Sequence, residues 1–153
     1  MTESRRGRPG YDRAGVLEIA VRAFNEHGYD ATSMGTLADR LGLSKSAIYH
    51  HFPSKESVLD AALEQGIGAL EAVLAEPGAT TGRAADRLRF VLERAVHVLV
   101  DRLPYVTLLL RLRGNTSVER AALERRREFD RAVTALVVEA RDAGQLRDDI
   151  DPR

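Results

Sequence analysis

The chain has 153 residues, enough for one domain or for a small module joined to a larger one, and its 23 basic and 23 acidic residues cancel. Bulk charge therefore does not indicate a nucleic-acid partner, and the absence of cysteine excludes disulfides and thiolate metal sites. No apolar run reaches the roughly 18 residues of a membrane span, and the polar start does not resemble a secretory signal, so we expect a cytoplasmic protein.

Residues 1–11 are polar and basic, with one proline and two glycines, and are predicted to form a disordered arm. Arg5, Arg6 and Arg8 cluster in this arm. Residues 6–9 read RGRP, the core of the minor-groove AT-hook. Arginine is attracted to the negative potential of a narrow A·T minor groove, so we assign these three residues to DNA contact. The alternative is a solubilising tail.

The first predicted helix follows Asp12, whose carboxylate can cap it, and runs to about His27. Gly28 ends this helix, since glycine readily takes the left-handed conformation. Its apolar face has helical spacing and consists of Val16, Leu17, Ala20, Ala23 and Phe24.

Residues 32–52, TSMGTLADRLGLSKSAIYHHF, are typical of two short helices joined by a tight turn. The first has apolar residues at spacing i, i+3, i+4 and i+7 and ends at Gly42. Ser44 can cap the second, residues 45–51, which buries Ile48. This pattern predicts a helix-turn-helix unit over residues 12–54, whose second helix lies in the DNA major groove. The apolar residues of the first helix are Met34, Leu37, Ala38 and Leu41.

Ser44, Lys45 and Ser46 begin the second helix, where side chains reach base edges or phosphates, and we assign them to DNA. The alternative is a solvated lysine and serines that only cap the helix. Lys55, in the first turn of the next helix, is predicted to hold a phosphate, with a free surface lysine as the alternative.

A connecting helix is predicted over residues 54–76, capped by Ser54 and ended by Pro77-Gly78. Its apolar stripe comprises Val58, Leu59, Ala62, Leu63, Ile67, Leu70, Val73 and Leu74. Residues 77–153 are predicted to form the C-terminal domain, with a loop over 77–82, helices over 83–103 and 116–143, and a short apolar segment between them. Leu88, Val91, Leu92, Ala95, Val98 and Leu99 are expected to face inward. No period-two alternation persists, so the predicted fold is all-α.

The chain resembles the TetR family of bacterial transcriptional regulators. The residues that carry the resemblance are Phe24, Gly28, Thr32, the run LADRLGLSKSAIYHHF over residues 37–52, Ser54, Lys55, Glu56 and Leu59. The resemblance implies an N-terminal three-helix DNA-binding unit followed by a helical ligand-binding domain, with a two-fold homodimer on a palindromic operator. It also implies that Thr32 and Ser33 abut a phosphate and that Tyr49 and His50 bind backbone phosphates. A packed core ring is the alternative for Tyr49.

Members of this family usually continue with two more helices that form most of the dimer interface. This chain stops at residues 151–153, where the first of them would begin. We therefore expect a truncated, incomplete C-terminal domain, and whether the shortened chain dimerises stays open at this stage.

The small-molecule pocket is predicted among apolar residues of the C-terminal domain, which suggests a greasy or aromatic ligand. The candidates are Val91, Arg94, Val98, Tyr105, Leu108, Leu109, Leu112, Phe129, Val133 and Leu136. Arg125, Arg126, Arg127 and Arg131 raise the hypothesis that an acyl-coenzyme A binds through its phosphates. The favoured alternative is an exposed helix face with Glu124 and Glu128 as local partners.

These observations predict a ligand-responsive transcriptional regulator, more specifically a repressor that a small, largely apolar ligand releases from double-stranded DNA. The alternative is a helical small-molecule sensor or carrier of the same fold that does not bind DNA. We expect no enzyme, cofactor or metal site, because no nucleophile-base pair, phosphate loop or metal-ligand spacing occurs in the sequence.

Overall fold

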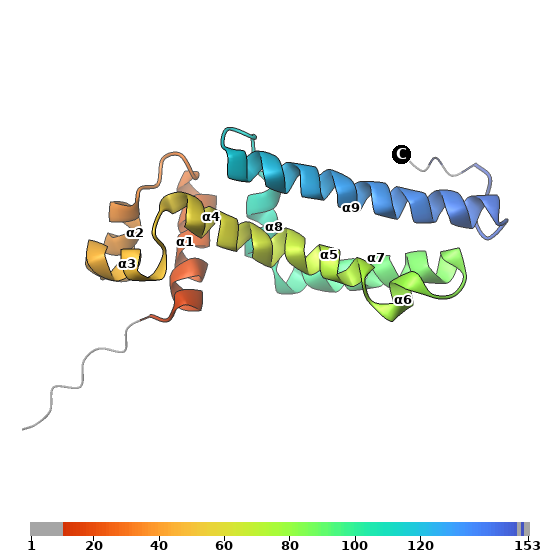
Figure 1. The fold of residues 1–153 in the computed structure, drawn as a ribbon, viewed down its shortest axis with the longest axis horizontal. Helices are drawn as coiled ribbons and strands as arrows, with labels where there is room; N and C mark the ends of the chain where they lie inside the picture. Colours follow the sequence, from red (N-terminus) through yellow and green to blue (C-terminus); the bar gives the residue numbers. More distant parts are fainter. Residues whose placement is uncertain (1–10, 150, 152–153) are drawn as a thin grey trace, which may run out of the picture. The chain divides into compact units, whose positions relative to one another are not determined.

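The computed structural model describes residues 11–149 and 151 and divides into two units, one up to Leu59 and one from Asp60 onward. All regular elements in this described part are helical, which confirms the predicted all-α class (Figure 1). None of the helices over the described residues is both long and apolar enough to span a membrane. The predicted contacts of Arg5, Arg6 and Arg8 lie outside these residues.

The first unit begins with α1 (Arg13–His27), which packs against the next two helices. The backbone N–H of Gly15 donates to Asp12 Oδ1 over 2.8 Å, which confirms the predicted cap. Each predicted apolar residue of α1 is buried, and Val21 is buried with them. The guanidinium of Arg13 lies 4.3 Å from the ring centroid of Phe52, whose side chain is completely buried.

The helices α2 (Met34–Leu41) and α3 (Lys45–His51) meet through a short turn at Gly42. Ser33 caps α2 and Ser44 caps α3, each through its hydroxyl oxygen. Gly42 has φ +62°, a left-handed conformation that side chains disfavour, so glycine suits this position. The predicted helix-turn-helix is therefore present, and Ser44 caps its second helix as predicted.

The connecting helix is formed by α4 (Lys55–Leu63), the π-helical turn η1 (Glu64–Gly68) and α5 (Ala69–Leu74). The sequence predicted one regular helix, and the wide turn in its middle is a difference. At this turn Gly66 is buried, and a Cβ added there would lie 3.3 Å from the carbonyl oxygen of Tyr105. The absence of a side chain thus permits close backbone approach at the irregular turn.

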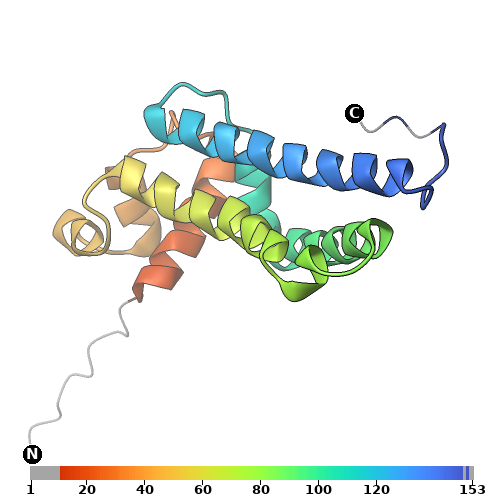
Figure 2. The same ribbon diagram turned by 45° about the vertical axis from the view of Figure 1, so that its right-hand side comes forward.

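The second unit continues with α6 (Pro77–Thr80), α7 (Ala84–Asp101), α8 (Leu103–Leu110) and α9 (Ser117–Asp142). The prediction of a loop over residues 77–82 is wrong for α6, because Pro77 is favourable in the first turn of a helix. The long helix α9 runs alongside α7 in both views (Figures 1 and 2). The unit's core forms around Val73, Ala79 and Val91.

The part of α7 and α8 that was expected to face inward is only partly buried. Leu88 and Val91 are buried as predicted, but Leu92 is 50% and Leu99 38% exposed. Helical spacing predicts which residues share a face, but it does not supply an element to cover that face. The large apolar side chains that are exposed on α7 and α8 are Leu92, Val96, Leu99, Val100, Leu103 and Leu110.

Candidate DNA-binding surface and ligand cavity

The short helix α3 separates apolar from polar side chains. Ile48 is completely buried, and Lys45, Ser46, Tyr49 and His50 are exposed. Tyr49 is 46% exposed, so the alternative of a packed core ring is wrong. We call these four exposed residues the polar face of α3. It offers an ammonium, a hydroxyl, a phenol and an imidazole, all capable of donating to phosphate or base acceptors.

Two predicted DNA-binding serines also stabilise helix ends. Ser33 Oγ accepts the backbone N–H of Thr36 over 3.0 Å, and Ser44 Oγ accepts that of Ala47 over 3.2 Å. Ser44 Oγ also lies 3.0 Å from Ser46 Oγ. Both capping serines are exposed, so their hydroxyl groups lie at the surface of the helix-turn-helix.

The side chains of Thr32 and Lys55 form hydrogen bonds to backbone carbonyls within the first unit. Thr32 is only 1% exposed, and its hydroxyl donates to the carbonyl of Gly28 over 2.8 Å. Because that side chain is buried, we correct its assignment from phosphate contact to structural support. Lys55 is half-buried, its Nζ donates to the carbonyl of Tyr29 over 2.9 Å and it lies 4.2 Å from that ring's centroid.

Sequence reasoning missed a polar cluster between α1 and α2. Arg40 Nη1 donates to Glu26 Oε2 over 2.9 Å, and its other terminal nitrogen contacts the ring of His27. The hydrogen bond and positive charge of Arg40 hold the pKa of Glu26 below its usual value. The partners are 13 and 14 residues apart, so no local sequence pattern could have identified them.

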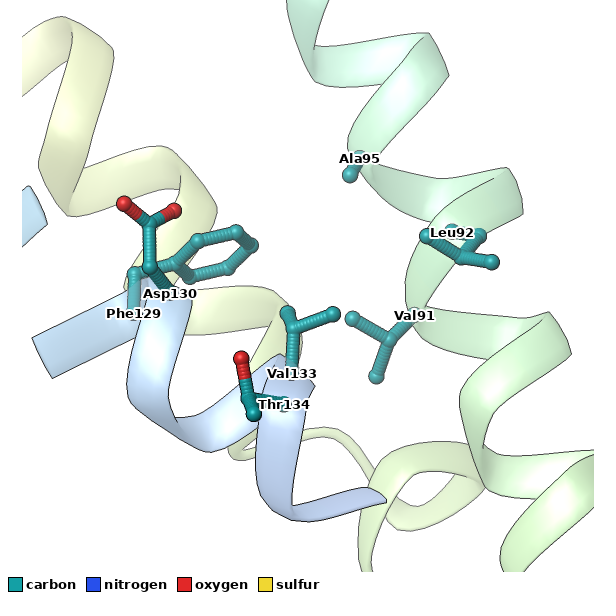
Figure 3. Close-up of a pocket in the computed structure, with 7 residues that line it drawn as sticks. All are labelled: Val91, Leu92, Ala95, Phe129, Asp130, Val133 and Thr134. Atoms are coloured by element: carbon teal, nitrogen blue, oxygen red, sulfur yellow. The ribbon is translucent and has the colours of Figure 1, made fainter. Parts of the chain in front are cut away.

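A cavity of about 400 Å³ lies between α7 and α9 in the second unit (Figure 3). Its lining is mostly apolar and consists of Val91, Leu92, Ala95, Phe129, Asp130, Val133 and Thr134. In Figure 3 the side chains of Val91 and Val133 point toward each other from the two helices. Such a volume and lining suit a small organic molecule.

Three of the ten predicted pocket residues, Val91, Phe129 and Val133, line this cavity. Leu108 and Leu109 are instead buried, Val98 and Leu136 pack against the core, and Tyr105 and Leu112 are half-buried. Arg94 does not line the cavity and instead donates to Glu76. Leu92, Ala95, Asp130 and Thr134 were missed, because contact between two distant helices leaves no local signal in the sequence.

Three of the four arginines considered for acyl-coenzyme A phosphates have carboxylate partners, and Arg126 is the one without a described partner. Arg125 binds Glu64 and Glu71, at 2.8 and 2.6 Å in the two ion pairs. Arg127 and Arg131 both bind Glu124, at 3.0 and 2.8 Å, as the alternative of a locally paired helix face expects. Hydrogen bonds from Arg131 and Arg127 lower the pKa of the Glu124 carboxyl.

No group of three or more His, Cys, Asp or Glu side chains is arranged to hold a metal ion within residues 11–149 and 151.

Comparison with known proteins gives two matching sequence profiles. Residues 16–62 match bacterial regulatory proteins of the tetR family, and residues 81–153 match the tetracyclin repressor-like C-terminal domain. The HTH-type transcriptional repressor AcnR of Corynebacterium diphtheriae is 30% identical over 140 residues, which are 90% of this chain and 70% of that protein.

Solved structures show the same similarity. SCO3833, a TetR-family regulator from Streptomyces coelicolor A3, is 47% identical with a TM-score of 0.86, covering 99% of this chain and 73% of that one. The TetR-family regulator PfmR of Thermus thermophilus is 28% identical with a TM-score of 0.75, covering 93% and 77%.

Proposed function

Because the chain belongs to the tetR family of bacterial regulatory proteins, we propose that it is a sequence-specific DNA-binding repressor released from its operator by a small, largely apolar ligand. The observation that carries the proposal is the polar face of α3, which is exposed while Ile48 anchors the helix from behind. The second helix of such a unit enters the major groove.

On this proposal, Lys45 and the serines that cap α2 and α3 contact phosphates, and Ser46, Tyr49 and His50 contact phosphates or base edges. Removing one phosphate contact by mutation lowers the slope of log K against log salt by about 0.9. Two copies would place their α3 helices in successive major grooves of a palindromic operator, about 34–36 Å apart.

The cavity between α7 and α9 is the proposed effector site. A ligand there releases DNA only if it binds the non-operator state more tightly than the operator-bound state, by about 1–3 kcal/mol for an ordinary coupling. The continuous α4–η1–α5 segment spans the boundary between the units, so it is the proposed route of this coupling.

The test is binding to DNA from upstream of the protein's own gene, followed by fluorescence anisotropy. The double variant Lys45→Ala, Tyr49→Ala should lose specific binding and retain its helical circular dichroism. Arg131→Ala, which removes an exposed cation from α9, is the control and should bind as the parent does. Equal affinity of parent and double variant would refute the assignment of α3.

The same measurement separates the alternative function. A sensor or carrier without DNA binding would bind ligand but give no salt-sensitive binding to any upstream fragment.

A further inference from the structure

The ligand cavity carries one charged side chain, Asp130, in an otherwise neutral lining. Five of the seven lining residues are apolar, and Thr134 is the only other polar one. Figure 3 shows the Asp130 carboxylate and the Phe129 ring projecting from the same turn of α9. Asp130 is exposed, so its side chain is reached by solvent.

Within the described residues, the Asp130 carboxylate has no ion pair or hydrogen bond to protein. Three arginines of α9 and α7 are paired with other carboxylates, and Arg126, four residues before Asp130 on α9, forms no ion pair within the described residues. Arg131 and Arg127 both bind Glu124, and on the facing helix Arg94 binds Glu76. The carboxylate thus remains available to a partner that enters the cavity from solution.

The chemistry of this lining selects by charge. A cationic ligand gains attraction from the carboxylate and from the face of the adjacent aromatic ring. An anionic ligand of the same shape meets repulsion from Asp130 and finds no free cation in the lining. We propose that the cavity takes a hydrophobic cation, an amine or quaternary ammonium on an apolar body, with Asp130 and Phe129 holding the positive group.

This inference rests on the proposed effector role of the cavity and names the class of its ligand. It also argues against an acyl-coenzyme A as the occupant of this cavity. An acyl-coenzyme A carries several phosphate charges, and the cavity lining offers no cation to receive them.

Tetraphenylphosphonium and tetraphenylborate test the proposal directly, because they share one shape and carry opposite charges. Isothermal titration calorimetry of each ion against the full chain should give measurable tetraphenylphosphonium binding and weaker tetraphenylborate binding. In Asp130→Asn the affinity for tetraphenylphosphonium should fall about fivefold, the size of an exposed ionic contact, with no loss for tetraphenylborate.

Glu128→Gln is the matched control, since it removes an exposed acid from the same helix without altering the cavity lining. It should leave both affinities unchanged. Phe129→Leu should weaken tetraphenylphosphonium more than tetraphenylborate, because only the cation gains from the ring face.

The proposal is overturned if tetraphenylphosphonium fails to bind at millimolar concentration. Equal binding of that cation to the parent and to Asp130→Asn also overturns it. Operator binding in the absence of probe is measured on the same samples. A protein that binds DNA but not the cation refutes only the ligand class, whereas a protein that binds the cation but no DNA refutes the proposed regulator.

Discussion

Arg125 and Glu71 are joined by two parallel hydrogen bonds, from Nε over 2.8 Å and from Nη2 over 2.6 Å, which tie α9 to α5. The same guanidinium donates to Glu64 of the π-helical turn over 2.8 Å. A planar guanidinium matches a carboxylate in this bidentate geometry. One side chain of α9 therefore fixes two places on the connecting helix.

Replacing Glu71 should make stability depend on pH in a defined way. The hydrogen bond from Arg125 lowers the pKa of Glu71, so its contribution is present above the ordinary carboxyl pKa of about 4.5 and is lost as pH falls through the depressed value. Glu71→Gln should lower the unfolding free energy by about 0.5 kcal/mol at pH 7, a figure discounted for solvent screening. Urea titrations should show that difference vanishing in acid. Glu128→Gln, which removes an exposed carboxylate with no ion pair in the described residues, is the control with no measurable effect.

Two glycines of the π-helical turn should respond differently to alanine. A Cβ at Gly66 would lie 3.3 Å from the Tyr105 carbonyl oxygen, part of a backbone that must shift, so Gly66→Ala should cost about 1–2 kcal/mol. At Gly68 the nearest atom is the carboxylate end of Glu64, a flexible side chain that can move if its 2.8 Å ion pair with Arg125 is weakened. Gly68→Ala should therefore cost less than Gly66→Ala, about 0.5 kcal/mol for a weakened exposed ion pair. Thermal melts of both variants decide this, and a larger loss for Gly68→Ala would contradict the explanation.

Lys55 should matter for folding more than for DNA. Its Nζ is held by the carbonyl and ring of Tyr29, so Lys55→Met should lower stability by about 1 kcal/mol. The salt slope of DNA binding should stay as in the parent, while Lys45→Met should reduce that slope by about 0.9. A reduced slope for Lys55→Met would show instead that this lysine contacts phosphate.

The buried carboxylate of Glu119 should organise the turn before α9. Its Oε2 accepts the backbone N–H groups of residues 113, 114 and 115, at 3.1, 2.8 and 3.1 Å. Glu119→Ala leaves these three donors without a partner and should cost about 2 kcal/mol. Glu119→Gln keeps one carbonyl oxygen and should cost about half as much. Chemical denaturation would contradict this if the two losses were equal.

What the sequence revealed was local. Asp12 and Ser44 were predicted as caps, because a cap depends on three or four consecutive residues. The buried position of Ile48 followed from helical period. The exposure of Leu92 could not be predicted in this way, because the helical period shows which residues share a face but not whether another element packs against that face.

The cavity residues, too, could be predicted only where the local sequence was sufficient. Val91, Phe129 and Val133 were predicted from apolar character, and Leu108 was predicted by the same reasoning but is core. Asp130 was missed because an acid on a charged helix resembles ordinary surface. Only its place between α7 and α9 distinguishes it.

Gly42 links α2 to α3 with φ +62°, and an added Cβ would meet nothing within 4 Å. An L-residue at this position would therefore lose stability only because the left-handed backbone conformation disfavours its Cβ, which costs about 1 kcal/mol or slightly more. A mirror-image residue prefers this very region of backbone space, so D-alanine introduced by chemical ligation should rigidify the corner and stabilise the fold, whereas L-alanine weakens it.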